Sequence, residues 1–160
     1  MSSYHLAEPP LFTRLRDASS VLIAGAGGGF DVYGGLPLAV ALEKQGKKVH
    51  LANLSFSDLR RTPLDDWLVP GVAAVGPETP GNDDYFPERG LARWLATTGR
   101  EPIVYAFPKS GVRPLRAAYA ALVEQLDVDA LVLVDGGTDI LLRGDESGLG
   151  QPISPPLSTH

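Results

Sequence analysis

The chain has 160 residues, of which 44% are apolar, 14 are basic and 19 are acidic, so its formal net charge is −5 at pH 7. This length suits one folded domain, and an acidic chain without a long Lys/Arg run argues against a protein that grips a nucleic-acid backbone. The absence of cysteine excludes a disulfide scaffold, a thiol nucleophile and a Cys zinc site.

No apolar run approaches the roughly 20 residues that span a bilayer. The N-terminus also lacks the basic-then-apolar order of a signal peptide. We therefore expect a cytoplasmic protein with no membrane partner and no nucleic-acid partner.

Short apolar runs rich in β-branched residues predict buried strands. The first run, residues 21–24, is entered from two serines and ended by glycines. The same pattern returns at residues 49–54, 72–75, 103–107 and 131–134.

Helical periodicity fills the segments between these runs. The clearest helix is predicted over residues 114–126, where apolar residues recur at intervals of three and four. Others are predicted at 87–98, ended by Gly99, and at 36–45, ended by Gly46, with a short capped helix at 62–65.

Alternating strands and helices predict a parallel sheet wound by right-handed crossovers. We expect an α/β fold, a Rossmann-like three-layer sandwich with a mostly parallel sheet of about five strands, over residues 1–143. Residues 144–160 are rich in proline and glycine, and they predict an irregular tail.

The loop after the first strand is unusually rich in glycine. Gly27, Gly28 and Gly29 would let backbone N–H groups approach a phosphate or another anion, and a side chain at Gly28 would fill the space that the anion needs. Phe30 stands where a dinucleotide fingerprint requires glycine, and the second strand ends in Asn53 in place of an acidic residue that would hold a ribose, so NAD is disfavoured as a cofactor. SAM is also disfavoured, because no acidic residue precedes Gly25 in the first strand. A glycine loop needed only for a tight turn is the alternative, and Asp31 is either a helix cap or a ligand-binding or catalytic carboxylate.

The loop after the fourth strand combines two cations and a hydroxyl. Lys109, Ser110 and Arg113 immediately precede a predicted helix, which makes this loop a candidate anion site. Solvated surface cations are the equally weighted alternative.

The loop after the fifth strand is acidic. Asp135 directly extends a buried apolar run, where an unpaired carboxylate would be costly, so it needs a compensating partner. With Gly136, Gly137, Thr138 and Asp139 it forms a candidate ligand-binding loop in which Asp135 and Asp139 are candidate Mg²⁺ ligands.

Other residue types offer weaker signals. The three histidines lack metal-ligand spacing, and His50 is most simply a strand residue. No Gly-x-Ser-x-Gly motif is present, which disfavours a serine hydrolase. Tyr85 and Phe86 could pack on the core or form the rim of a site.

Two motifs together resemble a known family. The stretch VLIAGAGGGFDVYGGLPL at residues 21–38, with VDGGTD at 134–139 and RGDE at 143–146, resembles the uncharacterised family called domain of unknown function 1152. The resemblance covers most of the chain from Val21 to about Gly150. It implies an α/β domain with a glycine-rich and an acidic loop, and family members usually continue well beyond the equivalent of His160.

These features favour a small-molecule-binding protein, either an enzyme or the N-terminal half of one, that acts on a phosphorylated or nucleotide-like ligand. Asp135, Asp139 and Asp31 are the candidate catalytic residues, with Mg²⁺ as the candidate metal. The alternative is a non-catalytic binding or assembly subunit. In either case an uncovered edge at the last strand predicts a homo-oligomer or a second chain that completes the fold.

Overall fold

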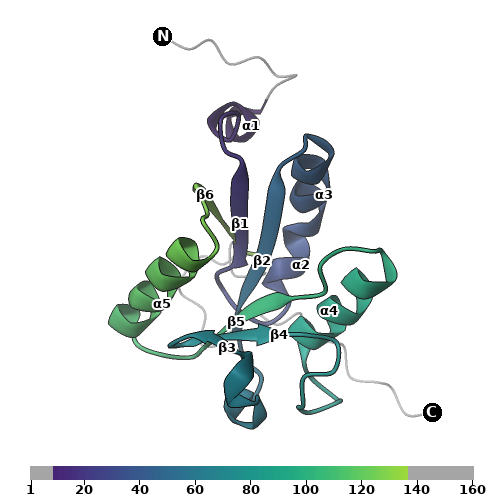
Figure 1. The fold of residues 1–160 in the computed structure, drawn as a ribbon, viewed down its shortest axis with the longest axis vertical. Helices are drawn as coiled ribbons and strands as arrows, with labels where there is room; N and C mark the ends of the chain where they lie inside the picture. Colours follow the sequence, from purple (N-terminus) through teal and green to yellow (C-terminus); the bar gives the residue numbers. More distant parts are fainter. Residues whose placement is uncertain (1–8, 137–160) are drawn as a thin grey trace, which may run out of the picture.

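The computed structural model of the protein describes residues 9–136, which form a six-stranded sheet with helices on both faces (Figure 1). The strands are β1 (Ser20–Gly25), β2 (Lys48–Ser55), β3 (Trp67–Val69), β4 (Val72–Val75), β5 (Val104–Pro108) and β6 (Ala130–Val134). The helices are α1 (Pro10–Arg14), α2 (Asp31–Gly34), α3 (Leu36–Lys44), α4 (Pro87–Thr97) and α5 (Val112–Gln125), with short 3-10 turns η1 (Leu59–Arg61) and η2 (Leu64–Asp66).

The centre of the sheet is parallel, as the apolar runs predict. The strand order is β3-β4-β5-β2-β1-β6, and β1 pairs in parallel with both β2 and β6, while β2 pairs in parallel with β5. Every residue of β1 is buried, because this strand has a neighbour on each side and helices or loops over both faces.

The far edge of the sheet corrects the expectation of about five strands. The sheet has a sixth strand, β3, which pairs antiparallel with β4, and β4 in turn pairs antiparallel with β5. Only Pro70 and Gly71 separate β3 from β4, and Gly71 has φ of 81°. Such a short connection cannot return a strand in the parallel direction, so these two strands form a hairpin.

The helices divide between the two faces. Leu42 of α3 and Leu91 of α4 pack with Val21 and Ile23 of β1 in one core cluster. Leu122 of α5 packs with the alternate β1 residues in the other cluster. Figure 1 shows α5 on one side of the sheet and α2, α3 and α4 on the opposite side. This α/β arrangement is consistent with the expected Rossmann-like sandwich.

The three long predicted helices are confirmed as α3, α4 and α5, with no end shifted by more than two residues. The sequence did not predict α1 or α2, which have five and four residues respectively and are too short to show helical periodicity. No helix among residues 9–136 is long and apolar enough to cross a membrane. The predicted tail at residues 144–160, and Gly137, Thr138 and Asp139, lie outside the described residues.

Candidate functional site

The loops singled out in the sequence meet at one edge of the sheet. Because β1, β2, β5 and β6 run in the same direction, their carboxyl ends lie together. The register places Gly25 beside both Asn53 and Val134, and Ser55 beside Pro108. The glycine loop, the Lys109 loop and the Asp135 loop therefore begin at neighbouring strand ends.

The glycine loop has a backbone that only glycine adopts easily. Gly28 and Gly29 have φ of 94° and 63°, in the left-handed region. Both are buried. The N–H groups of residues 27–30 donate no hydrogen bond to another residue of the described chain. Since buried N–H groups in proteins are nearly always paired, the N–H groups of Gly28 and Gly29 are available to an acceptor that the protein itself does not supply. Gly27 and Phe30 are exposed, so their N–H groups can donate to water.

Two carboxylates lie beside Gly27. A Cβ built at this glycine would meet Oδ2 of Asp31, and it would lie 3.1 Å from Oδ1 of Asp135. Oδ1 of Asp31 also accepts a hydrogen bond of 3.2 Å from the N–H of Gly136. The structure thus joins Asp31 to the loop that follows β6, although the two segments are more than 100 residues apart.

The second oxygen of Asp31 is unusual. It is buried and accepts no hydrogen bond from any residue in the part of the chain that the structure describes. A buried carboxylate oxygen needs a proton, a cation or a hydrogen-bond donor. A ligand or a metal ion between Asp31 and Asp135 would meet this need.

The space beside Gly28 differs from the sequence-based expectation. The ring of Phe56, in the loop after β2, occupies the position that a Cβ at Gly28 would take. An anion therefore does not lie on this side of Gly28. Lys109 lies next to the same ring, with Nζ 3.9 Å from the ring centroid, so Phe56 links the glycine loop to the cationic loop.

The residues of the cationic loop separate. Ser110 lines an apolar groove between the β3–β4 hairpin and α5, together with Pro70 and Gly71. Arg113 is exposed in the first turn of α5. Neither Lys109 nor Arg113 forms an ion pair with a carboxylate in the described residues. Among the described contacts of these three residues, only that of Lys109 leads to the glycine loop, through the ring of Phe56.

A buried network of hydrogen bonds holds the glycine loop at the carbonyl of Gly29. Nδ2 of Asn53 donates to the carbonyl of Gly29 at 2.8 Å and to Oε1 of Glu88 at 2.7 Å. Ser57 donates a longer bond of 3.4 Å to Oε2 of the same carboxylate. Asn53 and Glu88 are both fully buried. This network fixes the carbonyl of Gly29 and so the shape of the loop.

The sequence did not predict that Glu88 belongs to the site. It follows Pro87 in the first turn of α4, where an acidic residue normally favours the helix N-terminus and stays solvated. The only available signal was the polar Asn53 at the end of a buried strand. Burial and the nearby Glu88 carboxylate raise the pKa of Tyr33, whose hydroxyl donates to the carbonyl of Pro87 at 2.9 Å.

Three aromatic side chains cluster at the end of the glycine loop. The ring of Phe30, at the end of the glycine loop, lies 5.5 Å from that of Tyr33 and 5.8 Å from that of Tyr85. A Cβ at Gly29 would lie 3.3 Å from the hydroxyl of Tyr85. Tyr85 therefore lies at the rim of the site, one of the two positions that the sequence left open.

The assignment of Asp135 and Asp139 as Mg²⁺ ligands remains a prediction. The described residues contain no group of three or more His, Cys, Asp or Glu side chains arranged to hold a metal ion. Asp135 has Asp31 as its carboxylate neighbour at Gly27, and Asp139 lies outside the described residues. Two carboxylates with retained waters and a ligand phosphate would still suit Mg²⁺.

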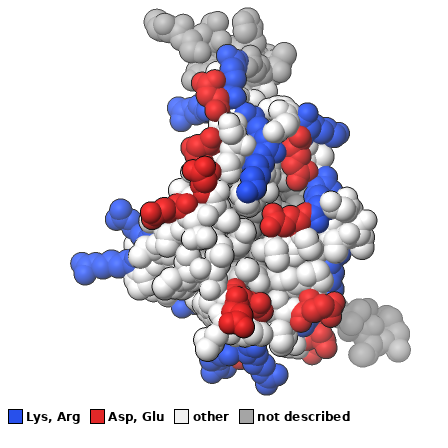
Figure 2. All heavy atoms as spheres, viewed as in Figure 1, with Lys and Arg blue, Asp and Glu red and all other residues white. Residues whose placement is uncertain are grey.

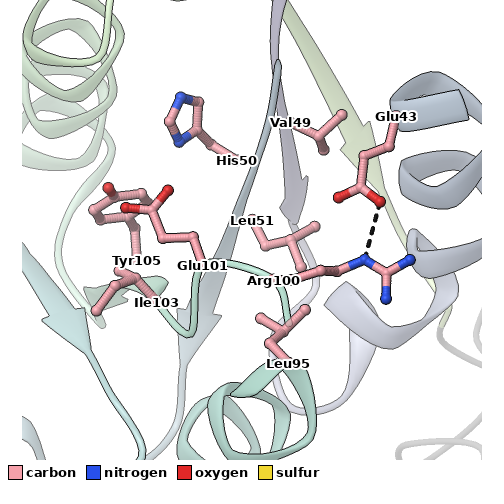
Figure 3. Close-up of a pocket in the computed structure, with 9 residues that line it drawn as sticks. All are labelled: Glu43, Val49, His50, Leu51, Leu95, Arg100, Glu101, Ile103 and Tyr105. Atoms are coloured by element: carbon pink, nitrogen blue, oxygen red, sulfur yellow. Dashed lines mark hydrogen bonds and ion pairs between the residues drawn. The ribbon is translucent and has the colours of Figure 1, made fainter. Parts of the chain in front are cut away.

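A small cavity lies near the amino ends of β2 and β5, at the opposite end of these strands from the glycine loop (Figure 3). Its walls include His50, Glu101 and Tyr105, and its volume of about 40 Å³ admits a few water molecules but no organic substrate. Burial lowers the pKa of His50, and its buried Nε2 has no partner among residues 9–136. This cavity is therefore not a substrate site.

The charged surface is mixed. On the face drawn in Figure 2, basic and acidic side chains are interspersed, and no continuous basic stripe crosses it. The exclusion of nucleic-acid and membrane partners remains a prediction from composition.

Comparison with known proteins adds no assignment. No family model, no curated protein and no solved structure matches the chain. The resemblance to domain of unknown function 1152 therefore remains a prediction, and the function has to be argued from the site.

Proposed function

We propose that the protein binds a phosphorylated small molecule at the carboxyl edge of its sheet and acts on it as an enzyme, or as part of one. The observation that carries this proposal is the pair of buried N–H groups at Gly28 and Gly29, which donate to no residue of the described chain. Donors clustered in a glycine loop suit the several oxygens of one phosphate group.

The surrounding charges give the ligand a second requirement. Lys109 supplies one positive charge near the loop, whereas Asp31 and Asp135 supply two negative charges beside Gly27. A bare phosphate would be repelled by this carboxylate pair. A divalent cation between the phosphate and the pair removes the repulsion and gives the buried Oδ2 of Asp31 a partner.

This arrangement of charges suits a reaction at a phosphoryl group or a phosphate ester. Lys109 would neutralise charge on the phosphate, while Asp31 or Asp135 would hold the cation or transfer a proton. Arg113 and Ser110 remain candidate binding residues at the outer side of the same loop.

Calorimetric titration with inorganic tripolyphosphate, with and without MgCl₂, tests this proposal. We expect binding that is stronger with Mg²⁺ and that weakens at least about tenfold in Lys109→Ala. Lys44→Ala is the matched control, because Lys44 is an exposed cation in the last turn of α3. Absence of binding under both conditions would reject the phosphate site.

A second candidate function is an assembly subunit completed by another chain. Strand β6 pairs only with β1 among the described strands, and its Leu131 and Leu133 are 43% and 58% exposed. An apolar edge of this kind favours an added strand or subunit. Sedimentation at micromolar concentration distinguishes an oligomer from a monomer.

A further inference from the structure

The two exposed phenylalanines of the described chain both lie at the glycine loop. The protein has five phenylalanines, and of these Phe30 and Phe56 are 59% and 46% exposed, while the other three are buried or half-buried. Phe30 ends the loop, and Phe56 packs against Gly28. Both exposed phenylalanine rings of the described chain thus lie where the proposed phosphate would bind.

The two rings differ in how much contact they can still make. Phe56 already packs against Gly28 and has the Lys109 ammonium 3.9 Å from its centroid. Phe30 meets Tyr85 edge-on, with an interplanar angle of 89°, and Tyr33 at 59°. Neither neighbour stacks flat on Phe30, and more than half of its surface remains accessible, so a planar group can stack on it.

Resting on the proposed function, we infer that the ligand is a phosphate ester with a planar ring, of the nucleotide class, whose ring stacks on Phe30 while its phosphates bind the adjacent glycine loop. Tyr33 and Tyr85 hold the Phe30 ring in place through their edge and tilted contacts. Stacking on an aromatic side chain accepts any base, because every base has a π-face.

The apolar groove beside α5 is the competing location for a ring. It is lined by Pro70, Gly71, Pro108, Ser110, Pro114, Ala117, Ala118 and Ala121. None of these residues belongs to the glycine loop, and neither Phe56 nor Lys109 lines the groove. The groove thus has no wall in common with the donors of the loop, which favours Phe30 as the stacking residue.

The test compares ATP with inorganic tripolyphosphate, both with Mg²⁺, by calorimetry on the full chain. We expect ATP to bind at least about tenfold more tightly than tripolyphosphate. Phe30→Leu should remove this difference and leave the affinity for tripolyphosphate unchanged, whereas Phe30→Trp should retain it. Trp94→Leu, which removes a 44% exposed ring from α4, is the matched control.

Three other results would overturn the stacking inference. Equal affinities for ATP and tripolyphosphate in the unchanged protein overturn the stacking inference and leave the phosphate site intact, even if Phe30→Leu does not fold. A selective loss of ATP affinity in Ala117→Phe, with Phe30→Leu normal, would move the ring to the groove and also overturn it. If neither compound binds, the proposed function fails, and the inference fails with it.

Discussion

Asn53 donates a hydrogen bond of 2.7 Å to the carboxylate of Glu88, and both side chains are fully buried beneath the glycine loop. This pair connects the end of β2 to the first turn of α4. The same amide group donates to the carbonyl of Gly29. Loss of this amide would therefore change both the stability of the fold and the shape of the loop.

Asn53→Asp should destabilise the protein by about 2–4 kcal/mol, because it removes two donated hydrogen bonds and places a second carboxylate beside Glu88. Denaturation by urea measures this loss. Since a neighbouring carboxylate raises the pKa of the introduced group, the loss should be smaller at about pH 4 than at pH 7. Glu88→Gln, which can still accept from Asn53, is the control and should cost less.

Gly28→Ala should destabilise the protein by about 1–3 kcal/mol, because φ is 94° and the new methyl group would meet the Phe56 ring. In the double variant with Phe56→Ala, the additional loss caused by Gly28→Ala should be smaller. Gly34→Ala is the control, since nothing lies within 4 Å of its added Cβ and its φ is negative. Equal effects at the two glycines would contradict the close contact with Phe56.

Asp31→Asn should leave the fold intact and abolish the gain in tripolyphosphate affinity that Mg²⁺ provides. The amide can still accept from the N–H of Gly136, but it lacks the charge that a cation requires. Asp135→Asn should have the same effect. Melting curves and calorimetry with and without MgCl₂ distinguish this outcome from a structural role, in which stability would fall and the Mg²⁺ effect would persist.

His50 should make stability depend on pH in the weakly acidic range. Burial lowers its pKa below the ordinary value of 6.5, and Lys48 adds to this effect while Glu101 opposes it. The unfolded chain therefore binds more protons, so this contribution to stability is fully present above about pH 6.5 and falls as the pH drops toward the folded pKa. His50→Gln should flatten the change in the free energy of unfolding between pH 7.5 and 5.

Leu133→Glu tests the exposed edge of the sheet. If β6 pairs with another chain, the unchanged protein should sediment as an oligomer and this variant as a monomer with a similar melting temperature. Leu64→Glu is the control, because Leu64 is 88% exposed in the turn η2. A monomer at micromolar concentration in the unchanged protein would contradict the edge prediction.

Periodicity was enough to predict most of the fold. Five of the six strands follow from short apolar runs, since strands buried on both faces must be apolar along their length. Strand β3 could not be found in this way, because its three residues are only half-buried or exposed at the sheet edge. Its pairing depends on the hairpin geometry at Gly71, which an apolar pattern does not encode.

The site was predictable only as a set of loops. The rule that parallel strands end at one edge predicts that the loops at Gly27, Lys109 and Asp135 begin close together. It does not predict side-chain contacts between loops, such as Phe56 on Gly28. The burial of Glu88 could not be predicted either, because an acidic residue in a first helical turn is ordinarily explained by the helix dipole.

The position of strand β6 at the sheet edge affects how often the site is fully assembled in solution. It is joined to the described sheet through β1 alone, and Asp129, just before its first residue, accepts hydrogen bonds from the N–H groups of Ser19 and Ser20. Edge elements of this kind open more readily than the centre of a sheet. When β6 detaches, Asp135 and Gly136 leave Asp31, while the glycine loop stays on β1. Occupation of the site should therefore slow amide hydrogen exchange along β6, even though the ligand touches only its end.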